Sequence, residues 1–140
     1  MSEAQLLKQF EQHTQPCTVS LGNGKVVAVD TQQSKVTMEF LSTPEHCHSG
    51  TVVQGGFVAG MLDSAMSMAV IAHTDFVKSP ATLELKVSYL SSTAPGRNRA
   101  VGWVVKAGKT IAFVEGELYG ENGELVAKAS SSARLVPRSE

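Results

Sequence analysis

Apolar and polar residues follow two different periods along the chain, and the change of period divides it into helices and strands. The longest apolar segment covers residues 55–73, where the pattern predicts one long helix. A shorter amphipathic helix is predicted at residues 3–12, with its apolar side chains on one face. Six further segments have strand patterns, at residues 26–30, 35–40, 83–89, 100–106, 110–119 and 125–136.

Turn residues separate these segments, most clearly Gly22-Asn23-Gly24, Ala94-Pro95-Gly96 and Asn122-Gly123. No repeat or linker divides the 140 residues, so we expect one domain over residues 1–140. A helix that is apolar nearly all round must be covered on most sides. A curved antiparallel sheet wrapped around one central helix meets that requirement, and the sequence therefore predicts an α+β fold.

Composition excludes several classes of function. With 18% charged residues and a formal net charge of -1, the chain has no basic surface that would indicate nucleic-acid binding. We expect no membrane span, because the longest apolar stretch is short and contains a carboxylate. The acidic N-terminal residues do not resemble a signal peptide, and two cysteines make neither a disulfide framework nor a metal motif. These features favour a reduced cytoplasmic protein with structural thiols and no metal site.

Asp63 is the only charged residue between Gly55 and Ala72. An ionised carboxylate in an apolar helix must be paired, must change its pKa, or must be kept for chemistry. At helical spacing it shares a stripe of small and polar residues with Gly56, Gly60 and Ser67. The helix alone leaves two interpretations open: a structural carboxylate that hydrogen bonds within the fold, or a catalytic one.

The start of the same helix offers a second chemical group. Gly55-Gly56 would expose backbone N–H donors at a helix N-terminus, where an anion or a polarised carbonyl binds well. Gly55 precedes Asp63 by eight residues, which is about 12 Å along a helix axis. One substrate therefore cannot contact both on one helix. If both act together, a two-fold homodimer with antiparallel central helices must bring Asp63 of one chain to Gly55 of the other.

The residues around these groups carry a resemblance to a known family. The run from His48 to Gly56, with Asp63 seven residues later, resembles the hotdog-fold acyl-CoA thioesterases of the phenylacetate-pathway (PaaI-like) type. Further likeness lies in Thr82, Glu84-Leu85, Tyr89, the turn at 94–96 and the hairpin at 106–113. The resemblance covers roughly residues 20–136 and implies a hotdog fold, in which a curved antiparallel sheet wraps one long helix.

The resemblance also implies an activity and residue roles. Gly55 N–H would polarise a thioester carbonyl, and Asp63 of the partner chain would act as general base or nucleophile. Thr82 would position the attacking water. The substrate would be an acyl-CoA or related thioester, hydrolysed without metal or cofactor by a homodimer that pairs further into a homotetramer.

Two positions depart from the family pattern. The family histidine before Gly-Gly is Gln54 here, and the asparagine six residues earlier is His48. A glutamine amide can donate to a carbonyl or sulfur but cannot transfer a proton, whereas histidine titrates near neutral pH. We include both in the catalytic set and place Gly56, Ser67, Arg97 and Lys109 in the substrate-binding set, although solvated surface charges are the alternative for the last two.

Two other functions remain open on sequence. His48 with Asp63 imitates the histidine–carboxylate pair of hotdog hydratases and dehydratases, but the chain lacks their Gly-His-Phe-Pro and Asp-x4-His motifs. A non-catalytic acyl-CoA-binding module is the third possibility, and it would not need a helix carboxylate. His46 and His73 are expected to be exposed residues, and Cys47 a structural thiol.

Overall fold

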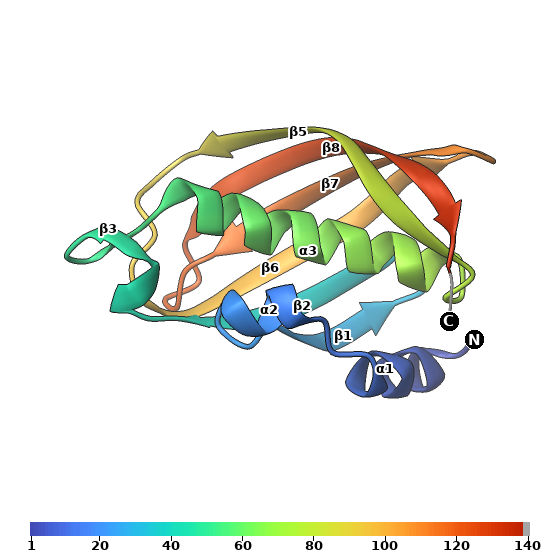
Figure 1. The fold of residues 1–140 in the computed structure, drawn as a ribbon, viewed down its shortest axis with the longest axis horizontal. Helices are drawn as coiled ribbons and strands as arrows, with labels where there is room; N and C mark the ends of the chain where they lie inside the picture. The colour runs from blue at the N-terminus through green and yellow to red at the C-terminus, as the bar shows by residue number, and fades with distance from the viewer. Residues whose placement is uncertain (139–140) are drawn as a thin grey trace.

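The computed structural model describes residues 1–138, which form a six-stranded antiparallel sheet around one long helix (Figure 1). The predicted α+β hotdog architecture is confirmed. In chain order the elements are α1 (Glu3–Gln12), α2 (Pro16–Ser20), β1 (Lys25–Asp30), β2 (Lys35–Ser42), a 3-10 turn η1 (Pro44–His46), β3 (Cys47–Ser49), β4 (Val52–Val53), α3 (Gly55–His73), β5 (Lys78–Tyr89), β6 (Gly96–Ala107), β7 (Ile111–Tyr119) and β8 (Leu125–Pro137).

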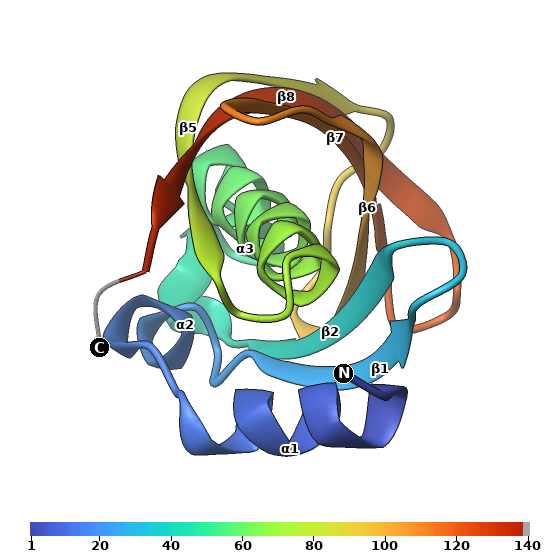
Figure 2. The ribbon, with the colours of Figure 1, turned by 90° about the vertical axis from the view of Figure 1, so that its right-hand side faces the viewer.

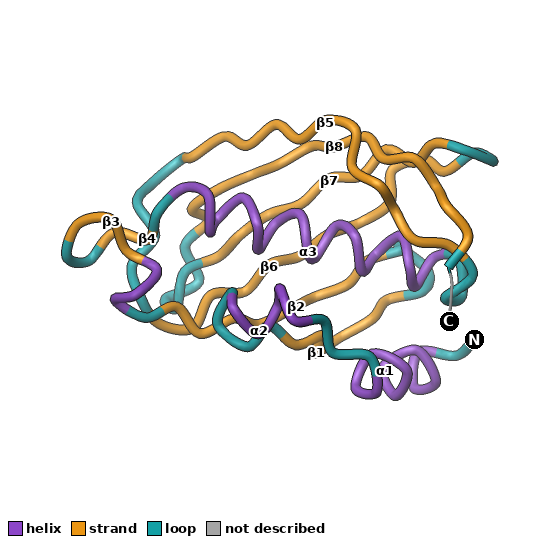
Figure 3. The backbone as a smooth tube through the Cα atoms, viewed as in Figure 1, coloured by secondary structure: helices purple, strands orange, loops and turns teal. Residues whose placement is uncertain are grey.

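The sheet has the strand order β1-β2-β6-β7-β8-β5, and every pair is antiparallel. It curves around α3, with β1 and β5 as its two edge strands (Figure 2). These edges do not pair with each other, so the sheet stays open along one side of the helix. A second, two-stranded sheet of β3 and β4 extends beyond the N-terminal end of α3 (Figure 3).

Helix α3 forms the centre of the core, because ten of its nineteen residues are buried. It lies directly on β6: a Cβ built at Gly102 would be 2.6 Å from the carbonyl carbon and oxygen of Ala65. By length and composition α3 could cross a membrane, so the expectation that the apolar stretch is too short was wrong. In this fold the sheet covers its apolar sides, which makes it the core helix rather than a span.

The strand prediction for residues 83–89 needs a correction. Strand β5 begins earlier, at Lys78, and its register with β8 shifts between Thr82 and Glu84. Such a β-bulge places an extra residue on one strand and reverses the alternation beyond it. In the sequence Leu83 and Leu85 alternate with polar residues, which predicts that both are half-buried on one face. Because of the bulge Leu83 is 61% exposed, whereas Leu85 stays half-buried.

His46 was expected to be exposed, but it is buried. Its Nδ1 accepts the backbone N–H of Thr43 at 3.0 Å, so its Nε2 carries the proton and donates to the carbonyl of Ser20 at 3.0 Å. The ring also meets Phe57 edge-on, with centroids 5.0 Å apart. His46 thus fixes the loop before α3 to α2 and to the helix itself. His73 is exposed as expected.

Candidate active site

The first turn of α3 presents one backbone donor without a partner. Gln54 is the N-cap residue, and its side-chain Oε1 accepts the N–H of Gly56 at 3.0 Å. The N–H of Gly55 has no hydrogen-bond acceptor within residues 1–138. Because the partial positive charge of the helix is concentrated at this end, the free N–H is well placed to bind a carbonyl oxygen that gains negative charge.

Strand β5 holds Gly55 from the other side. The hydroxyl of Tyr89 donates to the carbonyl oxygen of Gly55 at 2.7 Å. A Cβ built at Gly55 would lie 3.2 Å from Cζ and Oη of that ring, so the glycine allows the close approach. The sequence indicated Tyr89 as part of the family-like strand but gave it no role in the site. Its ring is 54% exposed, and its contact with Gly55 joins positions that no local pattern connects.

Asp63 lies on α3 opposite Thr82 of strand β5. The hydroxyl of Thr82 donates to Asp63 Oδ1 at 3.0 Å, which orients the carboxylate. No Lys, Arg or His within residues 1–138 forms an ion pair with Asp63, and its Oδ2 has no donor there. The carboxylate is half-buried rather than enclosed, because it lies on the open side of the helix.

The other members of the small polar stripe share this open side. Gly60 and Ser67 are half-buried and Gly56 is exposed, so the described residues cover this helix face only in part. Leu21, just after α2, borders it: a Cβ at Gly60 would lie 3.2 Å from Leu21 Cδ2. Gly55 and Asp63 are eight residues apart on one straight helix, about 12 Å along its axis, and they do not meet within one chain.

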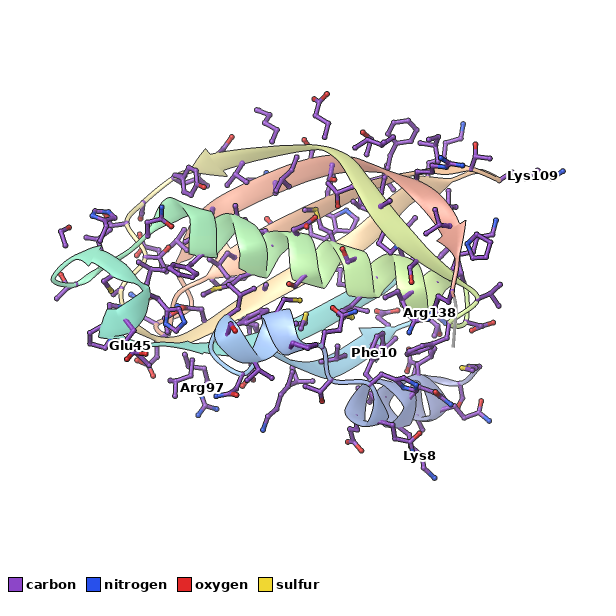
Figure 4. All side chains as sticks on the ribbon, in the orientation of Figure 1. Lys8, Phe10, Glu45, Arg97, Lys109 and Arg138 are labelled. Atoms are coloured by element: carbon purple, nitrogen blue, oxygen red, sulfur yellow. The ribbon has the colours of Figure 1, made fainter. Side chains whose placement is uncertain are left out.

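The remaining predicted residues are more dispersed. His48 is exposed on β3, and its side chain makes no hydrogen bond within the described residues. Arg97 lies at the start of β6 and pairs with Glu39 at 3.4 Å. Lys109 lies in the turn after β6, at the opposite end of the molecule (Figure 4). With about 3.3 Å per residue along a strand, one chain cannot bring Arg97 and Lys109 to one substrate phosphate.

Metal-binding potential is absent from the described part of the chain. Within residues 1–138 no three His, Cys, Asp or Glu side chains are grouped as they would have to be to hold a metal ion. The chemical groups at the start of α3 and on its open face are therefore a backbone donor, an amide, a hydroxyl and a carboxylate. Such a set suits polarisation of a carbonyl and activation of water.

Comparison with known proteins gives consistent matches. A family model described as the thioesterase superfamily matches residues 50–127. Human acyl-coenzyme A thioesterase 13 is 26% identical over 114 residues, which are 80% of this chain and 81% of the human protein. A solved structure of a phenylacetic acid degradation-related protein from Ralstonia eutropha JMP134 has a TM-score of 0.82 and 26% identity, covering 92% of this chain and 98% of that one.

A further solved structure shows that the fold is shared beyond recognisable sequence likeness. The PaaI protein of the phenylacetic acid degradation operon of E. coli has a TM-score of 0.83 at 14% identity, covering 96% of each chain. At that identity the likeness concerns the fold alone.

Proposed function

The chain belongs to the thioesterase superfamily and is a thioester hydrolase; we propose that its substrate is an acyl-CoA and that two chains build each active site. In each site, Gly55 of one chain polarises the thioester carbonyl and Asp63 of the other activates water. The observation that carries this proposal is the Gly55 N–H, which has no acceptor among the described residues and lies on the same helix whose open face carries Asp63. The Gly55 N–H supplies the donor for the carbonyl oxygen, and the Asp63 carboxylate supplies the base for water.

The reaction follows from these groups. The substrate carbonyl oxygen accepts the Gly55 N–H, which stabilises the negative charge that develops during attack. Asp63 takes a proton from water as the new C–O bond forms, and the C–S bond then breaks. The proton passes from Asp63 to the departing sulfur, giving a carboxylic acid and coenzyme A. Attack by Asp63 itself, through an anhydride that water opens, uses the same geometry.

Thr82, Gln54 and His48 support this chemistry in different ways. The Thr82 hydroxyl fixes one carboxylate oxygen and leaves Oδ2 for water. Since Gln54 Oε1 already caps Gly56, its Nε2 is the free end of the amide and donates to the carbonyl or the sulfur. His48 lies on the hairpin that leads into α3 and binds the substrate from the exposed side.

Coenzyme A lies over the surface between the subunits. Arg97, at the same end of the molecule as the start of α3, meets its phosphates, and Ser67 borders the acyl group on the open face of α3. Lys109 can join Arg97 on one coenzyme A only if the partner chain supplies it, because the two lie at opposite ends of one chain.

The homodimer is supported by surfaces that one chain leaves incomplete. The open face of α3 carries Asp63 together with the small residues Gly56 and Ser67, which allow another helix to approach closely beside Leu21. Beside it, in the part of the chain that the structure describes, β5 pairs only with β8, so its other edge keeps unpaired backbone groups. Packing a second chain antiparallel on this side covers both features and creates two equal sites. The dimers pair further into a homotetramer.

The test is release of free thiol from a panel of acyl-CoAs, comparing wild type with Asp63→Ala and Asp63→Asn. We expect both variants to lose at least about 100-fold in kcat. Asp75→Asn is the matched control, because Asp75 is an exposed carboxylate whose ion pair is with the N-terminal amine. Hydrolysis that survives in the Asp63 variants contradicts the mechanism. Hydration of crotonyl-CoA without thiol release would support the hydratase, and binding without turnover the non-catalytic module.

A further inference from the structure

A cavity of about 560 Å³ lies between the N-terminal helices and the sheet, away from the open face of α3. Its walls come from α1, the link to α2, strands β1 and β2, and the second half of α3. Its lining is mainly apolar, with buried Phe10, Met38 and Met68 and half-buried Leu7 and Val26. The polar part of the lining is on the side of α2, where Thr18 is buried and Gln15 half-buried. Its volume falls within the range of about 300–1,000 Å³ that is usual for small-molecule sites.

The roof of this cavity is held firmly by the rest of the fold. Helix α1 buries Leu6 and Phe10, and Phe10 packs against the tilted ring of Phe76 with ring centroids 4.8 Å apart. Phe76 has a φ of 65°, a left-handed conformation that costs a bulky residue energy. The carboxylate of Glu3 accepts the backbone N–H of Thr31 at 2.9 Å, which ties α1 to the end of β1. These contacts hold α1 against the sheet and so keep the cavity beneath it.

Strand β1 widens the apolar wall. Its register with β2 shifts between Val26 and Ala28, so two consecutive valines, Val26 and Val27, both line the cavity. A regular strand would turn one of them to the opposite face. Two of the deepest residues are methionines, Met38 and Met68, whose flexible thioethers adapt to chains of different shape. The charged side chains that border the cavity, Glu11 and Lys25, are exposed.

The cavity is close to the proposed site along α3. Met68 follows Asp63 by five residues, which is about 7.5 Å along the helix axis and, at 3.6 residues per turn, about 140° around it. An acyl chain held at Asp63 would therefore pass Ser67 on the open face and turn around the helix to enter the cavity. We infer that this cavity receives the distal part of an acyl chain whose thioester is held at Asp63. This inference rests on the proposed function, and it assigns the substrate class as acyl groups long enough to pass Ser67. Short acyl groups would react without entering the cavity.

The experiment fills the cavity and compares chain lengths. Val26→Phe adds a ring to the apolar wall, and kcat/KM is measured with butanoyl-CoA and dodecanoyl-CoA. We expect a loss of at least about tenfold for dodecanoyl-CoA and less than about twofold for butanoyl-CoA. Val29→Phe is the matched control, because Val29 is half-buried on the same strand and does not line this cavity. Equal losses for both substrates, or no loss for either, overturn the inference.

A second variant and a binding measurement keep the test independent of folding and of catalysis. Leu7→Trp fills the cavity from the roof and is expected to give the same selective loss. Calorimetric titration with dodecanoate needs no turnover: we expect binding to wild type and to Asp63→Ala, and at least about tenfold weaker binding to Val26→Phe. Absence of dodecanoate binding to wild type overturns the inference. Binding that Val26→Phe weakens, in a protein that hydrolyses no thioester, leaves the cavity assignment standing and removes the proposed function.

Discussion

Replacing Gly55 by proline removes one N–H group while leaving the helix start almost unchanged. Gly55 is the first residue of α3, the position where proline is best accepted in a helix. Gln54, which precedes it, has φ -63° and ψ 139°, the conformation that a residue before proline adopts. The N–H that is lost has no acceptor within residues 1–138, so no hydrogen bond of the chain itself is broken.

The size of the expected effect follows from separating two changes. Both Gly55→Pro and Gly55→Ala place a Cβ about 3.2 Å from the Tyr89 ring, so they share any cost of moving that ring. Only the proline removes the donor. Loss of one oxyanion donor costs about 100- to 1,000-fold in kcat, whereas the alanine variant should lose less than about tenfold. We expect the stabilities of the two variants to agree within about 1 kcal/mol.

The assay is steady-state thiol release with butanoyl-CoA, combined with urea unfolding of each variant. The comparison that matters is the ratio of kcat for the alanine and proline variants, because the shared contact with Tyr89 cancels. If folded Gly55→Pro retains the kcat of Gly55→Ala, the N–H does not polarise the carbonyl and the reasoning fails. If both variants are equally inactive, the contact with Tyr89 matters rather than the donor.

Two further predictions concern packing and carboxylate orientation. Gly102→Ala should lower the free energy of unfolding by about 3 kcal/mol, because its Cβ meets the backbone of Ala65. Gly108→Ala, whose nearest contact would be at 3.7 Å, should change it by less than about 0.5 kcal/mol, and equal urea midpoints would contradict this explanation. Thr82→Val removes the hydroxyl that donates to Asp63 and should lower kcat about tenfold with little change in KM. Thr82→Ser keeps a hydroxyl and should keep the wild-type kcat. An unchanged kcat in Thr82→Val would show that the hydroxyl does not position the carboxylate.

Long helices and strands could be predicted from the sequence because apolar residues recur in them at the period of the element and so mark its buried face several times. Helix α3 and four of the six long strands were predicted within two residues of their ends, whereas β5 and β6 begin five and four residues before their predicted starts. Helix α2 and the pair β3–β4 were missed, since five, three and two residues are too few to show a period. Leu83 was misplaced because a β-bulge depends on pairing with β8 and leaves no mark in the strand itself.

The candidate site was predictable to a different extent. Asp63 could be identified because burying an unpaired carboxylate in an apolar helix is energetically costly. The rise of the helix then showed that Gly55 lies too far from Asp63 for both to contact one substrate on one chain. The contacts that hold these groups join distant segments: Tyr89 reaches Gly55, and Thr82 reaches Asp63. The burial of His46 likewise depends on the carbonyl of Ser20, twenty-six residues earlier. Such contacts are set by the arrangement of the elements, which local patterns do not encode.

The central claim, that each active site is shared between two chains, is tested most directly by mixing two inactive variants. Asp63→Ala keeps Gly55, and Gly55→Pro keeps Asp63, so a heterodimer of the two contains one complete site and one doubly defective site. After unfolding and refolding an equimolar mixture, random pairing makes about half of the dimers mixed, and we expect about one quarter of wild-type activity. A mixture as inactive as its separate components would contradict the shared site.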